Sequence, residues 1–312
     1  MPELVVDDVA LHYQCFGEGE DLVLIHGLGA NLACWYPGVA SELSQHYRVI
    51  LYDIRGHGKS AMPFSGYTMT HMIRDLHVLL EHLGVTRLHV VGHSFGARVA
   101  VHYALLYPHQ VATLTVADTQ FRCLQPRTRL CEWSYWKIWK QELEQKGIPL
   151  PSDREFISFR LLKQLHQASV ELMQSYSGRR KRGPSLKSRD MGQKGAARWE
   201  QLMETTTAKQ ELDDGEQLTQ ADFQTIAMPT LAVYGEYSHC IPSCDNLKEL
   251  MQDCQVVLQP KVGHFHPIVR PKMFVETLMQ FLQAHPFKAD RPDLNASLVE
   301  HRQDVVVERA SL

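Results

Sequence analysis

The sequence lacks the features that mark several large classes of protein. Its 312 residues contain no apolar run approaching the ~18 residues that a membrane-spanning helix needs, so we expect no membrane span. A net charge of only −3 gives no electrostatic basis for binding nucleic acid or an anionic membrane. The N-terminus has no basic segment followed by an apolar one, which argues against a signal peptide. Internal repeats and low-complexity tracts are also missing.

The cysteines are irregularly spaced. There are seven, an odd number, which argues against a disulfide framework and favours reduced thiols in the cytoplasm. Cys240 and Cys244 share a predicted helix face but lack histidine partners at zinc-binding spacing, so we expect no metal site.

Two glycine-containing segments resemble nucleotide-binding motifs but are incomplete. Gly27-Leu28-Gly29 is followed by Leu32 where a dinucleotide fingerprint requires glycine or alanine. Gly58-Lys59-Ser60 resembles the end of a P-loop, but Asp53 stands where the first glycine is required. We therefore expect no cofactor.

The composition and the order of the predicted elements favour a soluble α/β protein. Apolar residues make up 44% of the chain and charged residues 21%, which is ordinary for a globular domain. Short β-branched runs alternate with helical stretches, the pattern of a mostly parallel sheet covered on both faces. The strand signal stops after Asp118 and returns near Pro229. We expect a core at 1–119 and 222–285, a helical insertion at 120–221 and a polar tail at 286–312.

The motif that bears most directly on chemistry is Gly92-His93-Ser94-Phe95-Gly96. It follows an apolar run that begins at Leu88 and continues into a predicted helix. A strand, then G-x-S-x-G, then a helix is the nucleophile-elbow arrangement, in which a sharp turn presents the serine at the carboxyl edge of a sheet. Glycines flank such a turn because a Cβ there would collide with the adjacent strand or helix. Ser94 is therefore a candidate nucleophile.

A serine hydroxyl needs a base within hydrogen-bonding reach. Our candidate is His264, in the segment that directly follows the last predicted strand, because that position lies at the same carboxyl edge as Ser94. We expect His266 to be structural, since it points elsewhere. His93 is adjacent to Ser94, but the elbow directs it away, so we expect it to be a packing residue.

Acyl transfer also requires donors for the oxyanion of its tetrahedral intermediate. The backbone amide of Phe95, at the start of the predicted helix, is one candidate. The amide of Leu28, in the glycine-rich segment after the predicted strand at 21–25, is the other. The alternative interpretation of that segment is a glycine-rich turn without a catalytic role.

With these residues in place, the chain resembles the α/β-hydrolase fold superfamily, in its lid-bearing esterase, lactonase and C–C hydrolase branch. The resemblance implies a mostly parallel eight-stranded sheet flanked by helices, with the insertion serving as a helical lid. It spans about 1–118 and 222–285 and is carried by these segments in the family's order: His26-Gly27-Leu28-Gly29, Asp53 to Ser60, Gly92 to Gly96, Pro229 to Gly235, and Gly263-His264 followed by Pro271.

The sequence departs from the family pattern at the acid of the triad. The usual position, three residues after Gly235, holds Ser238, which cannot stabilise an imidazolium as an anion does. Asp118 ends the preceding strand and could reach the same histidine, as in certain haloalkane dehalogenases of the superfamily. The competing role for Asp118 is to cap the entry to the lid. Glu236 is the alternative acid, and Asp245 is a further one.

The insertion suggests what kind of substrate the protein takes. Trp133, Trp136 and Trp139 lie three residues apart in a predicted helix over Arg127–Lys146, where they could line an apolar pocket over Ser94 or pack the lid onto the core. The basic segment Arg179–Arg182 fits an acidic ligand or, alternatively, a solvated loop.

Together these features predict a serine hydrolase that cleaves a small ester, lactone or C–C bond in a substrate with an apolar portion. Two other functions fit the same sequence. A ligand-binding or scaffold protein could have kept the fold after losing its acid, as Ser238 suggests, and an acyltransferase would differ only in excluding water. The sequence does not indicate an oligomeric state.

Overall fold

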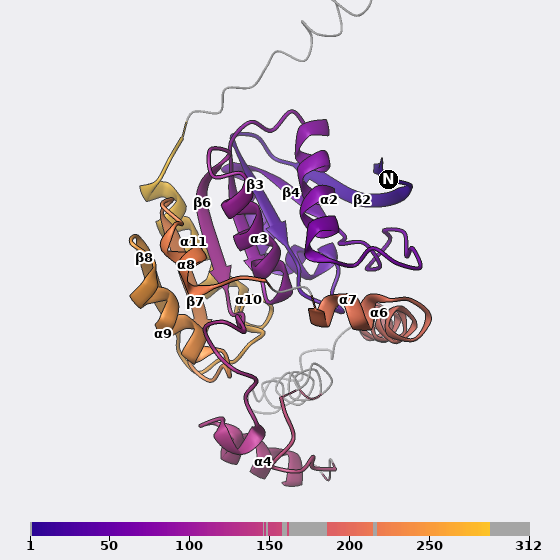
Figure 1. Cartoon of the computed structure of the whole chain (residues 1–312), viewed down its shortest axis with the longest axis vertical. Coiled ribbons are helices and arrows are strands. Elements are labelled where there is room, and N and C mark those ends of the chain that lie inside the picture. The colour runs from indigo at the N-terminus through magenta and orange to yellow at the C-terminus, as the bar shows by residue number, and fades with distance from the viewer. Residues whose placement is uncertain are drawn as a thin grey trace, which may run out of the picture.

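The computed structural model of the chain describes residues 2–145, 147, 149–157, 161, 186–214 and 217–287. Within these residues an eight-stranded sheet forms the centre of the molecule, in the order β1-β2-β4-β3-β5-β6-β7-β8 (Figure 1). In chain order the strands are β1 (Glu3–Val6), β2 (Val9–Phe16), β3 (Glu20–Ile25), β4 (Tyr47–Tyr52), β5 (Leu88–His93), β6 (Val111–Ala117), β7 (Thr230–Gly235) and β8 (Cys254–Gln259).

The sheet is mostly parallel, as the sequence predicts. The first two strands form an antiparallel hairpin, and β2 also pairs antiparallel with β4. All other neighbours run parallel. Parallel pairing aligns the carboxyl ends of β3 to β8 along one edge, and the loops that follow these strands therefore meet there.

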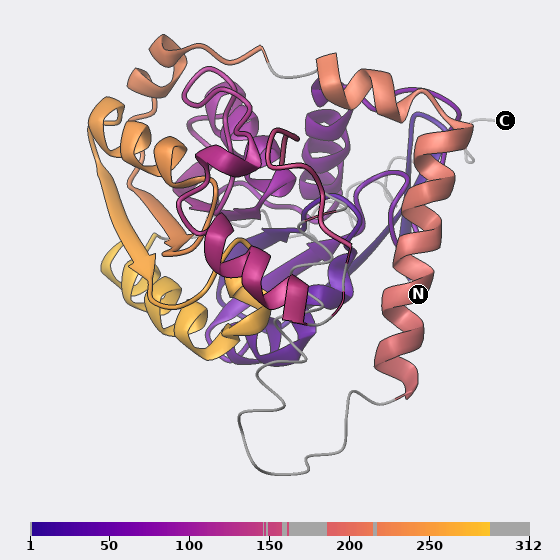
Figure 2. The same cartoon turned by 90° about the horizontal axis from the view of Figure 1, so that it is seen from below.

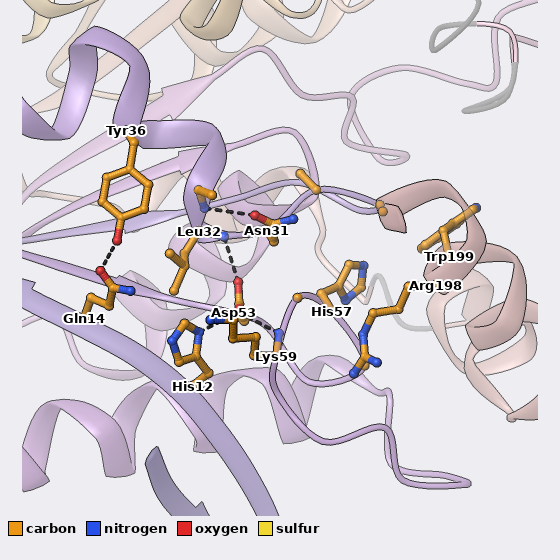
Figure 3. Close-up of a pocket in the computed structure, with 16 residues that line it drawn as sticks. His12, Gln14, Asn31, Leu32, Tyr36, Asp53, His57, Lys59, Arg198 and Trp199 are labelled. Carbon is orange, nitrogen blue, oxygen red and sulfur yellow. Dashed lines mark hydrogen bonds and ion pairs between the residues drawn. The ribbon is translucent and has the colours of Figure 1, made fainter. Parts of the chain in front are cut away.

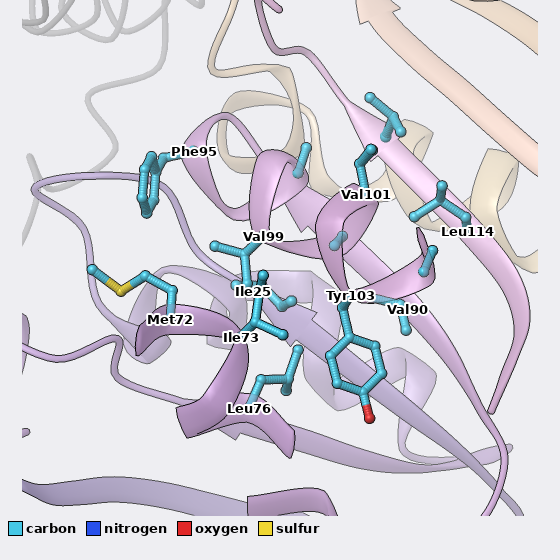
Figure 4. Close-up of a cluster of buried hydrophobic side chains, with 14 of the residues drawn as sticks. Ile25, Met72, Ile73, Leu76, Val90, Phe95, Val99, Val101, Tyr103 and Leu114 are labelled. Atoms are coloured by element: carbon cyan, nitrogen blue, oxygen red, sulfur yellow. The ribbon is translucent and has the colours of Figure 1, made fainter. Parts of the chain in front are cut away.

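Helices cover both faces of the sheet because successive strand residues point to opposite sides. Along β3, Val23 and Ile25 join one buried cluster, whereas Leu22 and Leu24 join another. The first cluster, part of which is drawn in Figure 4, packs against α2, α3 and α9. The second packs against η1, α1 and α11. These helices span α2 (Met69–His82), α3 (Phe95–Leu106), α9 (Ile241–Leu250), η1 (Leu32–Trp35), α1 (Ser41–Leu43) and α11 (Pro271–Ala284). Between η1 and α1 lies the short helix η2 (Tyr36–Ala40), and α10 (His266–Val269) precedes α11.

An insertion separates β6 from β7. Its described elements are η3 (Leu130–Glu132), α4 (Trp136–Gln145), α6 (Leu186–Thr205), α7 (Ala208–Asp214) and α8 (Gln220–Gln224). Figure 1 shows α4 beyond the end of the sheet at which β6 and β7 finish, and Figure 2 shows α4 in front of the sheet with α6 along one side. The helix α4 of the insertion therefore lies over the edge to which the candidate site residues belong.

The predicted single helix over Arg127–Lys146 is wrong in its first half. Leu130 begins only a short 3-10 turn, because the segment before it pairs with a later part of the insertion: Arg129 bridges to Phe156, and the Leu130 amide donates to the Glu155 carbonyl. The regular α-helix starts at Trp136.

Some predictions concern residues outside the described part of the chain. These are the basic segment Arg179–Arg182 and the tail beyond Phe287. The limits proposed for the core, insertion and tail stay predictions.

Among the described residues, none of the helices has the length and apolar character needed to cross a membrane. All seven cysteines lie in the described residues as free thiols.

Candidate active site

Ser94 occupies a strained turn between β5 and α3. Its backbone φ of 55° is in the left-handed region, which residues other than glycine rarely adopt. The glycines on either side are required by close packing: a Cβ on Gly92 would lie 2.2 Å from the Gly96 carbonyl oxygen, and one on Gly96 would lie 2.3 Å from the Ile25 oxygen. The turn places the Ser94 hydroxyl at the carboxyl edge of the sheet, as predicted for a nucleophile elbow.

Ser94, His264 and Asp118 form a continuous hydrogen-bonded chain. The Nε2 atom of His264 lies 3.0 Å from Ser94 Oγ, and its Nδ1 atom lies 2.9 Å from Asp118 Oδ1. A carboxylate only accepts hydrogen bonds, so Nδ1 carries the proton and Nε2 presents its lone pair to the serine hydroxyl. This is the tautomer that a general base requires.

Asp118 is fully buried and held by several donors. Its Oδ2 atom accepts from the Gly235 amide at 2.8 Å, and its Oδ1 atom accepts from the Ser238 hydroxyl at 2.5 Å. Burial raises the pKa of Asp118, but the hydrogen bond from His264 and the positive charge that His264 can carry outweigh that effect, aided by His266 and Ser238. The pKa of Asp118 therefore lies well below its ordinary value.

Ser238, at the family's usual acid position, thus contacts the carboxylate that approaches the histidine. Its hydroxyl donates to Asp118 and accepts from the Cys240 amide at 3.0 Å. The other acids are placed elsewhere: the Glu236 carboxylate accepts from the Lys261 amide at 2.8 Å, and Asp245 is exposed on α9.

The two histidines predicted to be structural are both buried, and both support the site. The Nε2 atom of His93 donates to the His264 carbonyl at 2.8 Å, which holds the loop that carries the base. His266 hydrogen bonds through Nδ1 to Gln259 Oε1 at 2.9 Å, and its Nε2 atom lies 3.8 Å from Asp118 Oδ2. His266 therefore lies closer to the acid than the sequence indicated.

The candidate oxyanion donors, Leu28 and Phe95, belong to two segments that adjoin Ser94. Phe95 is the first residue of α3, where a backbone amide has no partner within the helix. Leu28 follows Gly27, whose backbone passes so close to Ser94 that a Cβ on Gly27 would lie 2.9 Å from the serine Cβ. The glycine-rich segment thus meets the nucleophile rather than forming a distant turn.

Sequence reasoning missed two neighbours of His264. The ring of buried His239 has its centroid 5.3 Å from that of His264, and Cys240 Sγ lies 3.5 Å from His239 Nε2 and 4.0 Å from His264 Nδ1. The expectation that Cys240 lacks histidine neighbours is therefore wrong, because those neighbours are not at zinc-motif spacing in the sequence. The three ligand atoms lie within 4.8 Å of one another. A metal ion there would compete for the His264 nitrogen that donates to Asp118, so we assign none. The sequence feature that could have pointed to His239 and Cys240 is that they directly follow Ser238, at the family's usual acid position.

The three predicted pocket tryptophans belong to one apolar cluster of the insertion. Trp133 also reaches toward the site: its indole nitrogen donates to the Tyr237 carbonyl at 3.2 Å, and its ring lies edge-on to His239. Trp136 donates to Asp153 at 2.7 Å, and Trp139 packs at the cluster's margin. All three thus pack within the insertion, and Trp133 also contacts the core. The pocket role of the three, and packing of Trp136 and Trp139 onto the core, stay predictions.

Buried histidines around the site predict a dependence of stability on pH. Burial lowers the pKa of His266 to about 4 and the pKa values of His93 and His239 to about 3, from an ordinary 6.5. At pH values between these lowered pKa values and 6.5, the unfolded chain binds more protons than the folded protein does. The free energy of unfolding is therefore highest above pH 6.5 and falls as the pH drops toward 4.

We expect the free energy of unfolding, measured with urea, to fall between pH 7 and pH 5 by up to about 1.4 kcal/mol per pH unit for each such histidine. His266→Asn should make this dependence shallower, whereas His109→Asn, at an exposed position, should leave it unchanged. Equal slopes for wild type and His266→Asn would contradict the assignment.

Comparison with known proteins agrees with this geometry. The family model described as "alpha/beta hydrolase fold" matches residues 22–271. A protein named "Putative carbamate hydrolase RutD" from Variovorax paradoxus is 35% identical over 132 residues, which cover 39% of this chain and 50% of that protein. The 3-oxoadipate enol-lactonase 2 of Acinetobacter baylyi is 31% identical over 147 residues, 46% of this chain and 52% of that protein. The chain thus spans about half the length of these curated relatives.

A solved structure of a bacterial membrane phospholipase A has the same fold. It superposes with a TM-score of 0.70 and 22% identity, over 91% of this chain and 85% of that chain. The family match covers most of the sequence, and the sheet order, the elbow and the aligned carboxyl edge fit it. The chain belongs to the alpha/beta hydrolase fold family.

Proposed function

We propose that this protein is a serine hydrolase that cleaves small esters or lactones. The observation that carries the proposal is the chain of hydrogen bonds from Ser94 through His264 to Asp118. It supplies a nucleophile, a base in the required tautomer and a buried anion that orients the base. The non-catalytic alternative assumes that the acid of the triad has been lost. The Asp118 carboxylate beside His264 argues against that assumption.

The reaction follows from these positions. Ser94 Oγ attacks the acyl carbon while its proton moves to His264 Nε2, and the carbonyl electrons move onto oxygen. The amides of Leu28 and Phe95 donate hydrogen bonds to that oxyanion. When it collapses, the bond to the leaving alkoxide breaks and His264 donates its proton to the alkoxide. Water then attacks the acyl-enzyme with His264 again as base, which releases the acid and restores Ser94.

The substrate class rests on the surroundings of His264 and on the relatives. Trp133 and His239 place aromatic surface beside the base, which suits a substrate with an apolar portion. One relative is named as an enol-lactonase and another as a carbamate hydrolase, both of which act at acyl carbons. We accordingly propose ester and lactone carbonyls as the reacting groups.

Labelling with a fluorophosphonate tests the nucleophile. Such a probe reacts only with an activated serine, so we expect the wild-type protein to be labelled stoichiometrically and Ser94→Ala not to be labelled. Ser41→Ala, a matched change at an exposed position of α1, should be labelled like wild type. Hydrolysis of p-nitrophenyl butyrate should follow the same order.

A folded wild-type protein that resists the probe would overturn the proposal and favour the ligand-binding alternative. Labelling that persists in Ser94→Ala would place the nucleophile elsewhere. Circular dichroism of each variant shows whether it is folded.

A further inference from the structure

A cavity borders the loop that carries Leu28. It has a volume of about 410 Å³, within the range of small-molecule sites. Residues of β2, of the loops after β3 and β4, and of α6 line it, whereas Ser94, His264 and Asp118 do not. Figure 3 shows His57 and Arg198 next to each other on one side, with His12 beside Asp53 below.

Three of the residues that line it each have one buried nitrogen atom without a hydrogen-bond partner among the residues that the structure describes. These atoms are His12 Nε2, His57 Nε2 and Arg198 Nε. The two histidines are only 2% and 3% exposed. Because leaving a buried polar atom unpaired costs free energy, their meeting in one cavity points to a ligand that pairs with them.

The hydrogen bonds on the far side of each ring define what the ligand must supply. His57 Nδ1 lies 3.1 Å from the Arg55 carbonyl, which can only accept, so Nδ1 carries the proton. Burial lowers the pKa of His57 to about 3, so the ring is neutral and Nε2 is an acceptor. His12 Nδ1 lies 2.8 Å from the Asp53 carboxylate, so that contact occupies Nδ1 and leaves Nε2 as the unpaired nitrogen of the ring.

Arg198, in contrast to His57 Nε2, is a hydrogen-bond donor. One terminal nitrogen of its guanidinium donates to the Ser60 carbonyl, and its Nε–H is a donor. A carboxylate would pair with Arg198 but would turn lone pairs toward His57 Nε2. An ammonium group would donate to His57 but would be repelled by the guanidinium. A hydroxyl group both donates and accepts.

We propose that this cavity binds a neutral ligand with at least two hydroxyl groups, a small polyol or a sugar. Its hydroxyls donate to His57 Nε2, accept from Arg198 Nε and pair with His12 Nε2. Trp199, whose ring centroid lies 5.8 Å from that of His57, lines the same cavity and offers an aromatic surface to the C–H groups of such a ligand. Binding there requires no reaction at Ser94.

Saturation-transfer NMR with glycerol and with D-glucose tests the proposal. The experiment uses the full chain in a Ser94→Ala background, which makes the result independent of the proposed hydrolase function. We expect both probes to bind. His57→Phe and Arg198→Met should each weaken binding about tenfold, because each change removes one hydrogen-bonding group.

Matched changes at exposed positions, His109→Phe and Arg154→Met, should leave binding unchanged. If His57→Phe does not fold, the Arg198→Met comparison still decides. Equal polyol binding in all variants, or none in the parent protein, would overturn the proposal. So would binding of acetate, but not of polyols, that is lost in Arg198→Met, because the cavity would then be an anion site.

Discussion

Asp118→Asn is expected to lower kcat for p-nitrophenyl butyrate by about four orders of magnitude. The asparagine amide can donate to His264 Nδ1 where the carboxylate accepts, which favours the tautomer with its proton on Nε2, facing Ser94. The developing imidazolium also loses the anion now 2.9 Å away. Steady-state kinetics, with circular dichroism to verify the fold, measure the effect.

A second substitution should partly reverse this loss. Ser238 occupies the family's usual acid position, and its hydroxyl lies 2.5 Å from the oxygen of Asp118 that faces His264. In Asp118→Asn/Ser238→Asp the carboxylate returns to the neighbouring strand end. We expect kcat about a hundredfold above that of the single variant, since the anion and the required tautomer are restored without optimised geometry.

Two comparisons make this test specific. Glu236→Gln removes the alternative acid, whose carboxylate accepts from the Lys261 amide, and should retain nearly full activity. If Asp118→Asn were as active as wild type, Asp118 would not be the acid. A loss in Glu236→Gln of the same size would assign the role to Glu236. Failure of the double variant alone, with both single results as expected, would mean that position 238 cannot aim a carboxylate at His264.

Gly92→Ala is expected to destabilise the fold by about 4 kcal/mol or more. The added methyl group would lie 2.2 Å from the Gly96 oxygen, 2.4 Å from the Gly96 carbonyl carbon and 2.5 Å from the Ala97 Cα. All three are backbone atoms at the start of α3, so no side-chain rotation relieves the overlap, and the helix must separate from β5. The free energy of unfolding in urea measures the cost.

The same change in an uncrowded helix gives the opposite sign. Gly195 lies in α6, where the nearest atom that a Cβ would meet among the described residues is the Gly29 oxygen at 3.6 Å, an ordinary contact. Alanine favours a helix interior over glycine by up to about 1 kcal/mol, so Gly195→Ala should be neutral or stabilising. Similar destabilisation by both changes would mean that glycine at the elbow is not required by the close approach of β5 and α3.

Local patterns were sufficient where the chain forms structure from neighbouring residues. The alternation of β-branched runs and helical stretches predicts the parallel sheet, because buried strands and amphipathic helices have different periods. The helix over 127–146 failed at its start for a reason that no local pattern contains. There the backbone of Arg129 and Leu130 pairs with residues 25 or more positions later, and this pairing replaces helical hydrogen bonds.

The sequence by itself determined the fold family, the serine at the elbow and the histidine after the last strand, since each follows from motifs with strict local geometry. Only the tertiary structure showed which carboxylate faces His264. Asp118, Glu236 and Ser238 all lie at ends of adjacent strands, where neighbours are about 5 Å apart. Side-chain direction and burial separate them: Asp118 turns toward the histidine with Ser238 as a donor, and Glu236 turns to the Lys261 amide. The cavity with His12, His57 and Arg198 likewise exists only when β2, the loop after β4 and α6 meet, because these segments are far apart along the chain.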